Sequence, residues 1–202
     1  GRQLLQEEFR SESESSRPHS LIRPVSYVVG SGSHGYSFVS QSNGFLTLLP
    51  LGWYSEASTW DLSPGYERHN ARFDREVPLE CASCHNDIPD HIAGSRNRYR
   101  LPLPQGIGCQ RCHGPGELHV KTSDPRATGG SHRTIVNPAR LPADRQDDVC
   151  LQCHLISDIT VLSDGKDWNS FRPGQRLQDS RRDLFLKPED PAQFGFSSHA
   201  TR

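Results

Sequence analysis

The chain has 202 residues, of which 33% are hydrophobic, and a formal net charge of −1 at pH 7. This length fits one domain or two small ones, and the near-neutral charge excludes any electrostatic case for a nucleic-acid partner or an acidic membrane surface. No apolar run reaches the ~18 residues of a membrane span, and no signal peptide is visible. The 17 glycines and 15 prolines predict much irregular backbone, around a core that side chains alone would fill poorly.

The N-terminal segment, residues 1–23, is predicted to be a polar arm. Residues 3–10 could form a short helix, whereas the Ser/Glu run at 11–16 is too polar to pack. His19 is interpreted as a surface histidine, and a ligand donated to a neighbouring chain is the open alternative.

Residues 24–80 are predicted to form a β-hairpin and aromatic unit. β-Rich stretches occur at 25–29, 36–40 and 45–49, and Asn43-Gly44 between the last two is a strong type I′ hairpin signal. Residues 63–66 form a predicted turn. Trp53, Tyr54 and Trp60 could pack on a cofactor or close the β unit.

Residues 81–202 form the third predicted segment, which is mostly loop with short helices. A helix is expected from Pro142 to Leu155, with Asp144 and Asp147 near its positive N-terminal end. A shorter helix is expected over 117–120. After Asp164-Gly165 the chain is expected to be polar loop to its end.

Three copies of one motif occupy this segment: Cys81-Ala-Ser-Cys84-His85, Cys109-Gln-Arg-Cys112-His113 and Cys150-Leu-Gln-Cys153-His154. C-x-x-C-H is the attachment signature of c-type haem, in which two thiols bond to the porphyrin and the histidine binds iron as the proximal ligand. Two intervening residues place both sulfurs on one turn of backbone. We therefore expect three covalent haems, which would supply the missing apolar core.

Other uses of C-x-x-C fit less well. Zinc sites need pairs of such motifs, so three copies leave one over, and no βαβ pattern surrounds them as in a redox dithiol. Histidine makes up 10 of 202 residues, so its presence after all three motifs by chance has odds of roughly one in ten thousand.

Methionine is absent, so the usual sixth ligand of high-potential cytochromes is missing and bis-histidine ligation with low potentials is expected. The chain also lacks an initiator, so it is expected to be processed or an internal piece. Because haem is attached to such motifs outside the cytoplasm, we expect a periplasmic or extracellular, cell-surface location.

Seven histidines lie outside the motifs and could complete the irons: His19, His34, His69, His91, His119, His132 and His199. His91 and His119 follow a proximal histidine by six residues, too few to cross to the far face of the same haem. Either could serve a neighbouring haem. His34 sits in a glycine-rich turn where backbone can approach a cofactor closely. The sequence around these histidines ranks them only weakly as ligands. Separately, Arg96, Arg98 and Arg100 are candidate partners of haem propionates.

Several stretches resemble the multihaem cytochrome c family that is often fused to tetratricopeptide repeats, with a portion shared with tetrahaem electron-transfer cytochromes. They include the residue stretches 29–34, 49–54, 63–66, 81–86, 106–120 and 135–141. The resemblance implies a multihaem cytochrome c fold of low regular secondary structure, with a β-hairpin unit and short α-helices around three haems. It also implies that His119, His34 and His199 are distal ligands.

The sequence departs from that family in two ways. Family members carry a further C-x-x-C-H after a segment like 194–199, whereas this chain stops at Arg202, and tetratricopeptide repeats are absent. We therefore expect a fragment of a longer member, in which His199 could serve a haem outside this chain.

The sequence favours electron transfer through three bis-histidine haems, with redox proteins as partners. One alternative is an oxidoreductase that acts on a small nitrogen or sulfur compound at a five-coordinate haem. Another is a subunit of an extracellular cytochrome filament or larger redox complex, assembled with its own copies or with further haem subunits.

Overall fold

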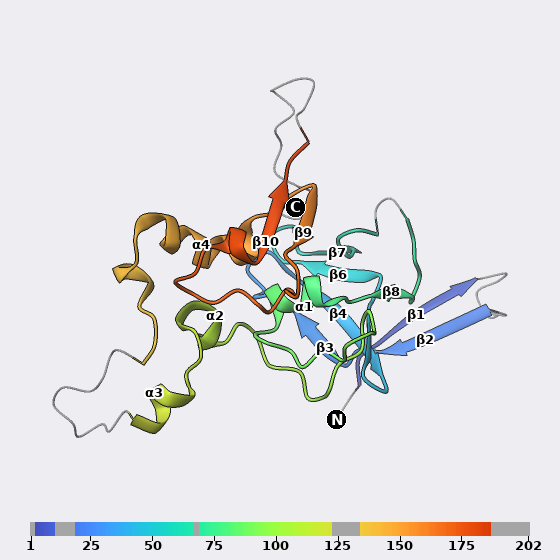
Figure 1. The fold of residues 1–202 in the computed structure, drawn as a ribbon. Coiled ribbons are helices and arrows are strands. Elements are labelled where there is room, and N and C mark those ends of the chain that lie inside the picture. Colours follow the sequence, from blue (N-terminus) through green and yellow to red (C-terminus); the bar gives the residue numbers. More distant parts are fainter. Residues whose placement is uncertain (1–2, 11–18, 67–68, 123–133, 187–202) are drawn as a thin grey trace. The chain divides into compact units, whose positions relative to one another are not determined.

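The computed structural model describes residues 3–10, 19–66, 69–122 and 134–186 (Figure 1). These residues belong to two compact units. The first, here the β unit, contains the described residues up to Cys81 together with 90–103. The second, here the motif unit, contains 82–89 and the described residues from Pro104 to 186. The division of the chain at residues 23 and 80 stays a prediction.

The β unit is built on a six-stranded antiparallel sheet with strand order β7-β6-β4-β5-β8, and β3 also pairs with β4. The long strand β4 therefore organises the sheet, because β3, β5 and β6 all pair along it. The strands are β3 (Tyr27–Val29), β4 (Gly35–Ser42), β5 (Phe45–Leu48), β6 (Leu51–Tyr54), β7 (Thr59–Leu62) and β8 (Arg75–Glu76).

The predicted hairpin turn joins β4 to β5. Asn43 and Gly44 have φ angles of 51° and 85°, the left-handed values that a type I′ turn requires at both central residues. A Cβ on Gly44 would lie 2.5 Å from the carbonyl oxygen of Tyr99, so only glycine fits there. The hairpin prediction is confirmed.

A small apolar core lies beneath this sheet. Phe38, Leu49 and Phe73 are at most 5% exposed, and Trp53 packs against them. Trp60 stacks on Phe38 at 5.6 Å between ring centroids and meets Trp53 edge-on at 5.4 Å. The tryptophans therefore help to close the β unit, one of the two roles predicted for them.

The N-terminal residues form a strand, not the expected helix. β1 (Leu5–Arg10) pairs antiparallel with β2 (His19–Pro24), as the two arrows labelled β1 and β2 in Figure 1 show. The side chain of Gln6 donates to the carbonyl of Leu51 at 2.8 Å and accepts from its amide at 3.0 Å. These long-range hydrogen bonds override the helix propensity of a segment rich in Leu, Gln and Glu.

The motif unit carries the helices. α2 (Cys109–His113), α3 (Glu117–Thr122) and α4 (Ala143–His154) lie in it, and α1 (Leu79–His85) runs into it from the β unit. A 3-10 turn, Pro138–Arg140, precedes α4. Pro142 caps α4 and Asp144 lies in its first turn, which confirms the longer predicted helix, and α3 confirms the shorter one.

The chain beyond Gly165 is not loop throughout, which corrects the sequence-based expectation. β10 (Arg181–Leu184) follows a 3-10 turn, Leu177–Asp179, and pairs antiparallel with β9 (Ile159–Leu162). The hydroxyl of Thr160 donates to the carboxylate of its partner Asp183 at 2.8 Å. Polar cross-strand contacts of this kind leave no apolar alternation in the sequence. Across the described ranges, no helix has the length and apolar character that spanning a membrane requires.

Candidate haem-attachment site

Each C-x-x-C-H motif occupies one turn of helix. The first motif ends α1, the second forms the whole of α2, and the third ends α4. Cysteines three residues apart lie on the same helix face, and the adjacent histidine is the last helical residue. All six cysteines lie in the described residues, and no disulfide joins any two of them there. This donor set, three thiol pairs each followed by an imidazole, fits covalent haem c.

The three motifs are joined by hydrogen bonds within the motif unit. Arg111, between the cysteines of the second motif, is only 4% exposed and donates through Nε to the carbonyl of Asp87 at 2.5 Å, just beyond the first motif. Gln152, between the cysteines of the third motif, donates to the carbonyl of Arg111 at 2.8 Å. The thiol of Cys84 donates to the carbonyl of Gln152 at 3.8 Å. The variable positions of the motifs thus hold the motifs together.

Arg111 has a second hydrogen-bond partner outside the motifs. Its Nη2 donates to the side-chain oxygen of Asn169 at 2.7 Å. Burial lowers the pKa of this guanidinium, but arginine remains charged in proteins. The motif unit therefore contains a buried cation at the point where its three motifs meet.

Two thiols from different motifs also lie together. A hydrogen bond with Cys153, supported by one from Ser83, lowers the pKa of the Cys84 thiol to about 6, whereas the same bond and burial raise the pKa of Cys153. A thiolate is the reactive form of cysteine.

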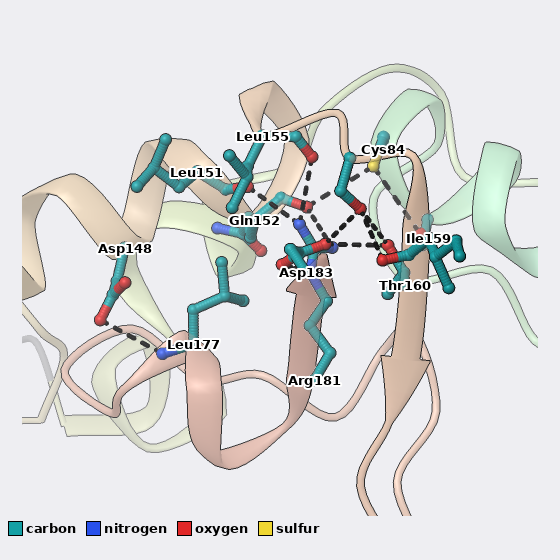
Figure 2. A network of polar contacts seen from close by, with 12 residues as sticks. Cys84, Asp148, Leu151, Gln152, Leu155, Ile159, Thr160, Leu177, Arg181 and Asp183 are labelled. Carbon is teal, nitrogen blue, oxygen red and sulfur yellow. Dashed lines mark hydrogen bonds and ion pairs between the residues drawn. The ribbon is translucent and has the colours of Figure 1, made fainter. Parts of the chain in front are cut away.

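Arg181 anchors the end of α4 (Figure 2). Its guanidinium donates to the carbonyls of Gln152 at 3.0 Å, Leu151 at 3.1 Å and Leu155 at 3.4 Å, and pairs with the carboxylate of Asp183 at 2.9 Å. Carbonyl groups in the last turn of a helix have no intrahelical partner. A cation there also complements the helix dipole, so Arg181 holds the turn that carries the third motif.

The histidine of the second motif, a predicted proximal ligand, has the hydrogen bond expected of a metal ligand. Nδ1 of His113 lies 2.8 Å from the carbonyl oxygen of Val136. A carbonyl can only accept, so Nδ1 carries the proton and Nε2 keeps a lone pair that a metal could bind. His85 and His154 end their helices and are exposed.

The structure places two of the three predicted distal ligands. His34 belongs to the β unit, where its Nδ1 lies 2.8 Å from a carboxylate oxygen of Glu56. His119 lies on α3, with Nδ1 at 3.1 Å from the hydroxyl of Thr134. His199 lies outside the described residues, as does His132. The assignment of His34, His119 and His199 as ligands stays a prediction.

Other candidate histidines differ in their surroundings. His19 and His69 are exposed. His91 packs edge-on against Tyr99 at 5.1 Å between ring centroids, and its Nε2 is buried without a hydrogen-bond partner in the part of the chain that the structure describes.

The arginines proposed for haem propionates contact protein groups in the β unit. Arg96 pairs with Glu76 at 2.6 Å and Arg100 with Asp90 at 2.9 Å, and Arg98 lies over the ring of Phe45 at 5.1 Å. Both ion pairs are solvent-exposed and therefore contribute little to stability.

Arg111, Gln152 and Arg181 were not identified from the sequence as site residues. Arg111 and Gln152 stood at the variable positions of the motifs, where no residue type is required, and nothing in the sequence marked Arg181.

Comparisons with known proteins agree with this site. Residues 56–114, which include the first two motifs, match the family described as cytochrome c554 and c-prime. The multiheme cytochrome MtrA of Shewanella baltica (strain OS185) is 28% identical over 114 residues, which cover 48% of this chain and 32% of that protein. This chain therefore spans about a third of the length of the curated relative.

A solved structure, that of the outer cell wall cytochrome OcwA, is 17% identical and covers 75% of this chain and 31% of its own, with a TM-score of 0.48. That likeness is too low to support an argument about the fold. The family match and the MtrA relative confirm the resemblance to multihaem c-type cytochromes that the motifs indicated.

Proposed function

We propose that the chain transfers electrons through three c-type haems, one at each motif, with imidazole on both axial positions. The main support is the hydrogen-bonded joining of the three motifs by Arg111, Gln152 and Cys84 within one unit. Proteins that hold cofactors for electron hopping need them close together and rigidly placed. Covalent haem supplies a one-electron iron couple whose potential the protein tunes.

Each residue of the proposed site has one role in holding the haems. The six motif cysteines hold the porphyrins, and His85, His113 and His154 are the proximal ligands. His34, His119 and His199 are the distal ligands. The Val136 carbonyl keeps Nε2 of His113 free to bind metal.

Electron transfer to and from this chain requires redox partners, which we propose to be other redox proteins or further haem subunits. The location we propose is periplasmic or extracellular, because haem is attached to such motifs outside the cytoplasm.

The proposal is tested on the haem-loaded protein by absorption and electron paramagnetic resonance spectroscopy. All three ferric haems should be low-spin, and cyanide or nitrite should not change the spectra. A high-spin component that binds either anion would instead indicate an open iron position and the oxidoreductase alternative. Replacing His119 by Ala should convert one haem to high-spin, whereas replacing the exposed His69 by Ala should convert none.

A further inference from the structure

Three histidines of the site have Nδ1 partners of different chemistry. Nδ1 faces a carboxylate oxygen of Glu56 in His34, a backbone carbonyl in His113 and a hydroxyl in His119, at 2.8, 2.8 and 3.1 Å. An ionised carboxylate is the strongest acceptor of the three. His34 is therefore the histidine whose ring is most strongly polarised by its partner.

The backbone holds this pair in place. His34 immediately precedes β4, and its carbonyl accepts from the amide of Ser55 at 2.8 Å, next to Glu56. Gly35 pairs with Tyr54 in the adjacent strands β4 and β6. The two side chains thus start just outside the paired ends of β4 and β6.

The pair borders an open hollow of about 390 Å³ in the β unit, together with Tyr54, Ala57, Thr59 and Asp61. The side chains of His34 and Glu56 are 79% and 69% exposed. An exposed pair of this kind contributes little to stability, so stability alone gives no reason for its geometry. It does leave the imidazole accessible to a metal.

The carboxylate also decides which nitrogen could bind iron. A carboxylate accepts and cannot donate, so Nδ1 of His34 carries the proton and Nε2 keeps the lone pair. Metal-ligating histidines commonly donate Nδ1–H to a carboxylate, which fixes the ring orientation and makes the imidazole a more basic ligand. A more basic ligand stabilises ferric iron over ferrous iron.

We propose that Glu56 is a positioning residue for His34 and lowers the reduction potential of the iron that His34 binds. This inference rests on the proposed function, in which His34 is a distal ligand. The conservative change Glu56→Gln keeps the size of the side chain and an acceptor oxygen but removes the charge. Asp61→Asn removes the same charge from the same hollow and is the matched control, because Asp61 accepts a backbone bond from Leu62 and makes no hydrogen bond or ion pair with His34 among the described residues.

The test is a spectroscopic redox titration of the haem-loaded full chain. Glu56→Gln should raise one of the three potentials, so that the reduced-to-oxidised ratio of that haem at a fixed potential rises about tenfold, equivalent to about 59 mV for one electron. One low-spin resonance signal should shift with it. Asp61→Asn should leave all three potentials unchanged, and Glu56→Asp should restore part of the shift.

Equal shifts in Glu56→Gln and Asp61→Asn, or no shift in Glu56→Gln, would overturn the inference. His34→Ala separates it from the proposed function. If that variant gains one high-spin haem while Glu56→Gln changes nothing, only the role of Glu56 is wrong. If His34→Ala leaves all haems low-spin, His34 is not a ligand and the inference falls, although electron transfer through low-spin haems would stand.

Discussion

Replacing Arg181 by Ala should destabilise the protein strongly. The Arg181 and Asp183 side chains are each 7% exposed and form an ion pair at 2.9 Å. Arg181→Ala would leave the carboxylate of Asp183 buried without its cation. It would also remove the donors that reach three carbonyl groups at the end of α4.

The expected loss follows from these contacts. Removing one partner of a buried ion pair costs about 3–5 kcal/mol. Asp183 keeps hydrogen bonds from Ser157 and Thr160, so we expect the lower part of this range, about 3 kcal/mol. The adjacent Arg182 is exposed, and its replacement by Ala should cost less than about 0.5 kcal/mol.

The assay is urea unfolding of the haem-loaded protein, followed by circular dichroism in the far ultraviolet and in the haem band. The double variant Arg181→Leu with Asp183→Leu removes both charges and should recover the part of the loss that comes from the unpaired carboxylate. The donors to the three carbonyl groups stay absent in it. If Arg181→Ala unfolds at the same urea concentration as Arg182→Ala, the helix-anchoring role of Arg181 is wrong.

Further predictions concern the contacts between motifs, the haem count and the pH dependence. Gln152→Leu should cost about 1–3 kcal/mol because it leaves the buried carbonyl of Arg111 without its donor, whereas Gln110→Leu, at an exposed position, should change the urea midpoint little. Replacing Cys150 and Cys153 together by Ala should remove one haem from the intact mass and leave the other two. Burial raises the pKa of Tyr66 from 10.0 to about 12. The stability that the protonated phenol contributes is therefore fully present below pH 10 and is lost as the pH rises from 10 to 12. The free energy of unfolding should fall by about 3 kcal/mol over that pH range. Urea midpoints at pH 9 and 11.5 test this, and the midpoint of Tyr66→Phe should fall less.

The elements that the sequence predicted correctly are those specified by neighbouring residues. Asn43-Gly44 determines its own turn through two positive φ angles, and α4 follows Pro142 at its N-cap and has an acidic first turn. The three motifs are also local, since two cysteines and a histidine within five residues need one helical turn.

The elements that the sequence missed depend on partners far along the chain. β1 is a strand because it pairs with β2 and because Gln6 reaches Leu51, 45 residues away. β10 forms opposite β9, and Arg181 reaches back to Gln152. A local pattern carries no signal for such pairings, and the choice among distal histidines depends on the same kind of long-range contact.

The central claim is that three haems are bound covalently to this chain, and intact-protein mass spectrometry under denaturing conditions tests it most directly. Denaturant removes any haem held by coordination alone, so only thioether-bound haem stays with the polypeptide. We predict a mass equal to that of the 202-residue chain plus three haems. A bare chain, or one that keeps fewer than three haems after expression with a c-type haem attachment system, would contradict the account.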